Sequence, residues 1–250
     1  MADPTINRPL ARQIIEILGS FGTPPARGIQ YFNVGNRSLL DAIDEFYLTS
    51  YLQDGGAAFK MVVGDYGSGK SHFLYCLRDI AWERNFAVVK VDLSPTETPY
   101  NDQKRVYQAV ATNLLWHEAT EGVSDESGLT RFLQGTLERI VGEELSLETL
   151  SNPLYRAMVD TVEGTPVDSP AYQTAVLAYL DSLIRQQEER VDSLTRWLMG
   201  EDTSPADTKI LREVGVTGKI NRPNAFRMCA HYARSYVPSH TAASFCSLTK

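Results

Sequence analysis

The stretch GDYGSGKS, residues 64–71, constrains the fold of this chain more than any other part of its sequence. It fits the pattern G-x-x-x-x-G-K-S/T without a mismatch. Glycines permit left-handed backbone conformations and let main-chain N–H groups approach phosphate oxygens closely. The lysine can reach the β and γ phosphates of a nucleotide, and the serine can offer a hydroxyl to Mg²⁺. The stretch therefore predicts a loop that binds nucleotide phosphates.

The sequence on either side of this loop has the order that such a loop requires. Residues 58–63, AFKMVV, are rich in β-forming residues and have the length of a strand. Apolar residues then recur at helical spacing from Phe73 to Ala81, and residues 86–92, FAVVKVD, predict a second strand. Strand, helix and strand make a βαβ unit, which needs a parallel sheet. We therefore predict an α/β fold with the N-terminal end of the helix directed at the phosphates.

The predicted nucleotide contacts comprise the loop and the residue after it. Lys70 is predicted to bind phosphate, and Ser71 to bind Mg²⁺. For Asp65 and Tyr66 the simpler interpretation is that they are solvated loop residues, and for His72 it is packing or capping. The predicted cofactors are ATP and Mg²⁺, and the predicted cofactor-binding residues are Gly64, Asp65, Tyr66, Gly67, Ser68, Gly69, Lys70, Ser71 and His72.

The chain is predicted to have three parts. Residues 1–100 begin with two helices, capped by Asn7 and Ser38, and continue into the nucleotide-binding βαβ region. From residue 101 to 237 almost every segment has helical periodicity, with Ser-Pro starts at 169–170 and 204–205. The periodic segments are 102–119, 129–142, 169–200 and 204–215. Residues 238–250 are predicted to be an irregular tail, and no strand is predicted after Arg234.

Hydrolysis of ATP needs a second, acidic site, and the sequence does not show one clearly. The expected pattern is a strand of about four apolar residues that ends in Asp, usually followed by Glu. Asp-Glu at 44–45 and Asp160 lie in helical patterns. Asp92 ends a predicted strand, but Lys90 interrupts its apolar run and Leu93 follows it. Asp92 is therefore interpreted as a strand-end residue, with Mg²⁺ binding as the alternative. The predicted sheet is also incomplete, because two strands leave its faces and edges uncovered.

The composition of the chain limits the classes of protein to which it can belong. The chain has 250 residues, is 43% hydrophobic and carries a net charge of −7, so we expect one or two domains and no overall attraction to nucleic acid or anionic membranes. No apolar run approaches the ~18 residues of a membrane span, and the N-terminus has no signal-peptide pattern, which predicts a cytoplasmic protein. Cys76, Cys229 and Cys246 form no CxxC pair, so neither disulfides nor a structural metal is expected, and Cys76 is predicted to be a small buried residue.

The sequence resembles the P-loop ATP-binding proteins of BREX-type bacterial phage-defence systems, of the BrxC and BrxD type. The resemblance rests on YFNVGN at 31–36, on GDYGSGKSHFL at 64–74 and on the VDLSP that follows. It is strong over about residues 10–118 and continues more weakly to about residue 234. It implies an AAA+-like ATPase with a large helical insertion, with Lys70 and Ser71 at the phosphates and Mg²⁺, and with residues 31–36 near the adenine.

The resemblance also implies binding partners, and the end of the chain departs from the family pattern. It implies that other defence components are partners. DNA is a partner by analogy alone, and the oligomeric state is left open. Where relatives continue into an apolar strand ending in Asp-Glu, this chain reads YVPSHTAASFCSLTK, which we interpret as a truncated or frame-shifted end. The leading hypothesis is therefore an ATP-binding protein with weak or no hydrolysis, and its status as an enzyme stays open. The alternatives are a non-catalytic interaction module stabilised by ATP and a small-molecule kinase with Asp92 or Glu97 near the acceptor.

Overall fold

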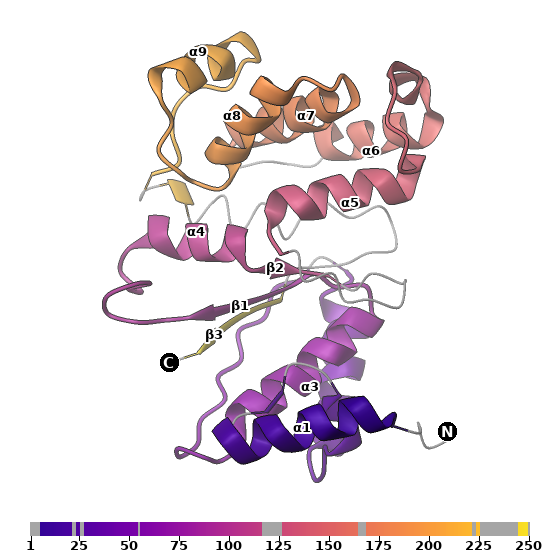
Figure 1. Ribbon diagram of the computed structural model, residues 1–250, viewed down its shortest axis with the longest axis vertical. Helices are drawn as coiled ribbons and strands as arrows, with labels where there is room; N and C mark the ends of the chain where they lie inside the picture. Colours follow the sequence, from indigo (N-terminus) through magenta and orange to yellow (C-terminus); the bar gives the residue numbers. More distant parts are fainter. Residues whose placement is uncertain are drawn as a thin grey trace. The chain divides into compact units, whose positions relative to one another are not determined.

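The computed structural model describes residues 6–21, 24–25, 28–54, 56–116, 127–164, 169–221, 224–225 and 245–249. The chain divides into two compact units, Met1–Arg84 and Asn85–Lys250, which are described separately. The described residues are mostly helical with a small sheet, which is consistent with the predicted α/β class (Figure 1).

The first unit is built from helices on both sides of the glycine loop. Its elements are α1 (Arg8–Phe21), η1 (Ile29–Tyr31), α2 (Arg37–Ile43), η2 (Asp44–Tyr51) and α3 (Lys70–Glu83). The predicted cap of the first helix is confirmed, because Asn7 Oδ1 accepts a hydrogen bond of 2.9 Å from the Leu10 amide. The second predicted cap is wrong: α2 already begins at Arg37, so Ser38 lies inside the helix.

The element η2 continues α2 without a break and is a π-helix. The hydroxyl of Thr49 donates to the Asp44 carbonyl at 2.9 Å, and that of Ser50 donates to the Glu45 carbonyl at 3.0 Å. Both bonds reach five residues back, which is the spacing of the π-helix backbone. The two hydroxyls therefore support an uncommon helix that sequence periodicity did not predict.

The strand predicted over residues 58–63 is not formed. These residues belong to no strand, and Phe59, Met61 and Val63 are exposed to 83%, 74% and 77%. A strand needs a neighbour for its main-chain hydrogen bonds, and the described part of the first unit contains no other strand. Local β-propensity alone therefore does not produce a strand here, and the βαβ unit predicted around α3 is not formed.

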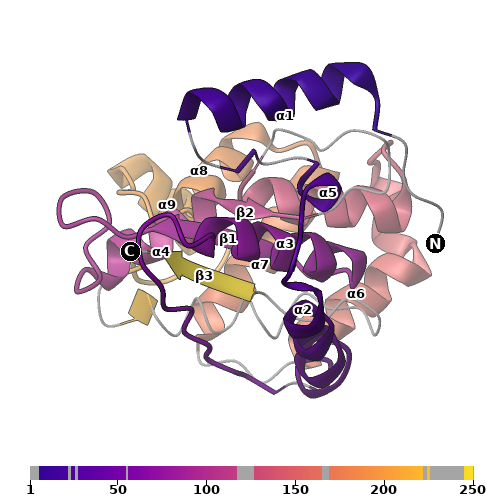
Figure 2. The ribbon, with the colours of Figure 1, turned by 90° about the horizontal axis from the view of Figure 1, so that it is seen from below.

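The second unit contains a three-stranded sheet in the order β2-β1-β3. Its strands are β1 (Val88–Asp92), β2 (Leu114–Leu115) and β3 (Phe245–Thr249). Strand β1 lies within the predicted residues 86–92 and confirms that prediction; it pairs antiparallel with β2 and parallel with β3. Figure 2 shows the arrow of β3 clearly. The prediction that no strand follows Arg234 is wrong for β3, because pairing with β1, far away in the sequence, supplies the hydrogen bonds that local pattern does not reveal.

The described residues of the second unit are mostly helical, with helix boundaries that differ from those of the periodic segments. Its helices are α4 (Gln103–Thr112), α5 (Leu129–Val141), η3 (Leu147–Ser151), α6 (Pro153–Gly164), α7 (Pro170–Ile184), α8 (Glu188–Leu198) and α9 (Pro205–Glu213). The segment predicted as helical over 169–200 is divided into α7 and α8, because Gln186 adopts a left-handed conformation with φ 56°. Helix α8 packs against both α7 and α9.

The core of the second unit joins α4 to the end of α8. Tyr107 is fully buried, and its hydroxyl donates to the Leu198 carbonyl at 2.5 Å. Gln108 Nε2 donates to the Gly200 carbonyl at 2.7 Å. Buried around this joint are Leu129, Leu133, Leu137, Tyr172, Leu180, Leu194 and Trp197. The unit therefore has a hydrophobic core of its own.

Candidate functional site

The glycine loop leads directly into α3, and the local structure explains why glycine is found at its three positions. Gly67 and Gly69 have φ angles of 82° and 86°, in the left-handed region where other residues are strained. A Cβ atom added at Gly64 would lie 2.5 Å from the Ser68 hydroxyl oxygen, closer than any ordinary contact. Backbone conformation therefore requires glycine at positions 67 and 69, whereas a side chain at position 64 would displace the Ser68 hydroxyl.

The start of α3 offers main-chain donors to an anion. The amides of the first helical residues, Lys70, Ser71 and His72, have no acceptor inside the helix. The Phe73 amide is the first that bonds back, to the Gly69 carbonyl at 2.9 Å. Residues 64–69 and Ser71 are exposed, so a ligand can approach this end. Such a helix start attracts negative charge through both its N–H groups and its dipole.

The lysine of the motif lies across the loop. Its Nζ atom donates to the carbonyl oxygens of Gly64, at 2.8 Å, and of Asp65, at 2.7 Å. The ammonium group is thus held over the loop by two neutral acceptors. A phosphate oxygen is a stronger acceptor than either carbonyl, because the hydrogen bond is then charge-assisted on both sides. The residues present therefore fit a phosphate ligand.

The residue after the motif connects α3 to the segment 31–36. His72 Nε2 lies 3.0 Å from Asn33 Oδ1, and its ring centroid lies 5.2 Å from that of Phe32. Burial lowers the pKa of His72 below its ordinary value, so the ring is neutral at neutral pH. These contacts agree with the packing role that was the simpler interpretation of His72, while its contact with a nucleotide stays a prediction.

Two side-chain contacts join the loop region to η2, and neither was predicted from the sequence. Before the loop, the Lys60 ammonium lies 4.1 Å from the Tyr47 ring centroid and donates to the Tyr47 hydroxyl. After α3, Arg84 forms a two-pronged ion pair with Asp44, at 2.9 and 2.6 Å. The segment that contains the loop and α3 is therefore anchored at both ends on one element. Cys76 is buried in α3 as predicted, and burial raises the pKa of its thiol to about 11.

The acidic candidate at a strand end, Asp92, has a basic partner in its own strand. Asp92, in the second unit, accepts a hydrogen bond of 2.6 Å from Lys90 Nζ. Asp65, in the loop, is exposed. No group of three or more His, Cys, Asp and Glu side chains in the described ranges is arranged to hold a metal ion. Mg²⁺ binding by Ser71 or Asp92 stays a prediction.

These features define a mainly helical α/β protein in which a glycine-rich loop opens a helix and holds a lysine across itself. The family model described as BREX system ATP-binding protein BrxC/D matches residues 6–234. Because the match covers most of the chain, the chain belongs to this family of BREX ATP-binding proteins, and the resemblance inferred from the sequence is confirmed. No curated protein and no solved structure matches the chain. In the described ranges, no helix has both the length and the apolar character needed to cross a bilayer.

Proposed function

We propose that this BREX ATP-binding protein holds the phosphates of ATP on residues 64–71. The observation that carries the proposal is the loop itself, in which Gly67 and Gly69 turn the chain into the start of α3 and Lys70 crosses the loop. Membership of an ATP-binding family supplies the nucleotide. The AAA+-like character of the fold, which the family resemblance implies, is part of the same proposal.

Each part of the loop has a distinct role in this proposal. The amides at the start of α3 bind phosphate oxygens, and Lys70 exchanges its two carbonyl acceptors for them. The exposed Ser71 hydroxyl provides a ligand for Mg²⁺, which supplies positive charge to the β and γ phosphates when bound. The binding requires no rearrangement of α3 itself, because the first-turn amides already lack acceptors inside the helix.

Hydrolysis is proposed to be weak or absent in residues 1–250. The sequence contains no apolar strand that ends in Asp-Glu. Among the described strands, β1 ends in an aspartate, Asp92, which is paired with Lys90 at 2.6 Å and is followed by Leu93. Phosphoryl transfer depends on positioned groups and charge stabilisation, so the lack of an acidic partner is expected to lower the rate by several powers of ten.

The proposal is tested by measuring the affinity for Mg-ATP calorimetrically in the chain and in Lys70→Ala. A charged hydrogen bond contributes about 1.5–3 kcal/mol, so the variant is expected to bind roughly 10- to 100-fold more weakly. Lys209→Ala removes the same charge from an exposed position on α9 and serves as the control, with affinity unchanged. Equal affinity of the chain and Lys70→Ala would reject the phosphate site, and ordinary ATP turnover would reject only the statement about hydrolysis.

One observation favours a second function, a non-catalytic interaction module. The second unit has a well-packed helical core of its own, while the loop lies in the first unit. In this case ATP raises the melting temperature by mass action, and turnover is absent. The two functions differ in one measurement, because an interaction module keeps its affinity for BREX components in the Lys70→Ala variant. Other BREX components as partners, and DNA, stay proposals from the family.

A further inference from the structure

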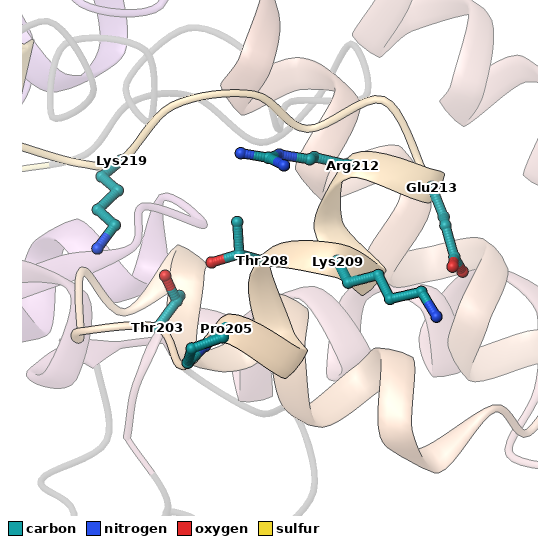
Figure 3. A pocket seen from close by; sticks show the side chains of 7 residues that line it. All are labelled: Thr203, Pro205, Thr208, Lys209, Arg212, Glu213 and Lys219. Carbon is teal, nitrogen blue, oxygen red and sulfur yellow. The ribbon is translucent and has the colours of Figure 1, made fainter.

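A second anion site is suggested by an open hollow beside α9, in the second unit (Figure 3). The hollow has a volume of about 690 Å³. Its lining residues are Thr203, Pro205, Thr208, Lys209, Arg212, Glu213 and Lys219. Three of these side chains are basic and one is acidic, although the chain as a whole carries a net charge of −7.

The lining side chains divide into two groups by direction. Arg212 extends toward the side of the hollow on which Lys219 lies, and the Thr203 hydroxyl faces the same space (Figure 3). Lys209 and Glu213 extend to the opposite side of α9. The single carboxylate of the lining is therefore directed away from Arg212 and Lys219, and the space between these two cations is positive.

Two further acids of this part of the chain, Asp207 and Asp202, are engaged by other groups. Asp207, on the inner side of α9, accepts bonds from Arg196 Nη2 at 2.6 Å and from the Ser193 hydroxyl at 2.9 Å, and these partners hold the pKa of its carboxyl far below the ordinary value. Asp202 is paired with Lys104 at 3.0 Å, and this partner lowers the pKa of its carboxyl, with a smaller contribution from Lys219. Within the part of the chain that the structure describes, no ion pair engages Arg212 or Lys219. Both cations thus have charge available for a ligand.

The loop that presents Lys219 is fixed to the core on both sides. Val216 and Ile220 are buried, with exposed fractions of 2% and 4%. Trp197 Nε1 donates to the Gly218 carbonyl at 3.0 Å, and Asn224 Nδ2 donates to the Lys219 carbonyl at 2.9 Å. The backbone beneath the ammonium group is therefore held in place, so a ligand does not have to order it.

We infer that this hollow binds a phosphate group of an anionic ligand, with Arg212 and Lys219 as its two cations. A guanidinium presents paired donors to phosphate oxygens, and an ammonium adds a point charge. The Thr203 hydroxyl is available as a third donor, whereas that of Thr208 already donates to the Ser204 carbonyl at 2.9 Å. Because the hollow is open, only the phosphate is gripped and the rest of the ligand stays outside. The site lies in the other unit from residues 64–71 and does not depend on the function proposed for them.

The test uses the full chain with Lys70→Ala, so that the glycine loop contributes less to phosphate binding. Pyrophosphate is titrated calorimetrically into this chain, into Arg212→Gln/Lys219→Gln and into the control Arg12→Gln/Arg139→Gln. The control also removes two positive charges, from exposed side chains on α1 and α5 that lie outside the lining of the hollow. We expect the first pair to weaken binding by at least about tenfold and the control to bind within about twofold of the parent.

A second arm identifies the source of the phosphate. Binding of a short fluorescent DNA duplex is measured by anisotropy at low and high salt, because contacts to a nucleic-acid backbone weaken steeply with salt. If Arg212→Gln/Lys219→Gln loses duplex binding and the control double variant keeps it, the result supports the site and assigns a phosphodiester. Loss of pyrophosphate binding alone supports it and assigns a small phosphate ligand. Equal losses in both double variants, or no binding of either probe by the parent, would overturn the inference; thermal melting verifies that every variant is folded.

Discussion

His72 Nε2 lies 3.0 Å from Asn33 Oδ1, although the two residues are 39 positions apart. The bond joins the third residue of α3 to the segment that precedes α2, so it fixes that segment beside the start of the helix. A neutral hydrogen bond contributes about 0.5–1.5 kcal/mol. We expect a coupling of this size between His72→Ala and Asn33→Ala in a double-mutant cycle of urea unfolding. Additive effects would show that the two side chains do not interact.

The stability of the chain should also depend on the protonation of His72. Burial lowers the pKa of His72 below its ordinary value of 6.5, so the unfolded chain binds a proton more readily than the folded one. The contribution of the neutral ring is therefore complete above pH 6.5 and is lost as the pH falls toward the folded pKa. Urea unfolding between pH 5 and 7.5 should show a steeper loss for the parent than for His72→Gln. Parallel curves for the two proteins would contradict this assignment.

Asp207 should be an important acid for the stability of the second unit. Its side chain is 7% exposed and accepts bonds from Arg196, Ser193 and the Ser204 amide. Asp207→Asn is expected to lower the free energy of unfolding by about 1–3 kcal/mol at pH 7. The pKa of Asp207 is depressed, so its contribution is present above pH 3.8 and is lost as the pH falls below that value.

The control for this prediction is Asp192→Asn on α8, since Asp192 is exposed. It is expected to change the free energy of unfolding by less than about 0.5 kcal/mol. The measurement is urea unfolding followed by circular dichroism at pH 7 and at pH 3. A difference between the parent and Asp207→Asn that is as large at pH 3 as at pH 7 would show that the carboxylate charge is not responsible.

Glycine at position 69 is required by backbone conformation rather than by space. Its φ is 86°, and nothing lies within 4 Å of a Cβ atom added there. Gly69→Ala is therefore expected to lower the free energy of unfolding by about 1–2 kcal/mol through left-handed strain, and to weaken Mg-ATP binding because the start of α3 shifts. Gly19→Ala, in α1, is the control: its φ is not positive and its surroundings are open, so it should stabilise by up to about 1 kcal/mol. Equal effects of the two variants would refute the argument from conformation.

Helix positions were predictable because their signals are local. Asn7 and the Ser204-Pro205 start were predicted as caps, and the structure shows Asn7 bonded to the Leu10 amide and Ser204 in a reciprocal bond with Asp207. The glycine loop was located with the start of α3 for the same reason, since residues 64–71 determine their own turn. Ser38 was misplaced because several polar residues near a helix start can act as its cap.

The sequence by itself determined the phosphate-loop motif, the helical periodicity and the family, since each depends on residues a few positions apart. Only the tertiary structure decided which β-rich segments became strands. Residues 58–63 found no partner strand in the first unit, whereas Phe245–Thr249 paired with β1 from far along the chain. It also decided the contacts His72–Asn33 and Arg84–Asp44. The physical reason is that a hydrogen bond between distant segments depends on where the chain folds back, which local propensity does not encode.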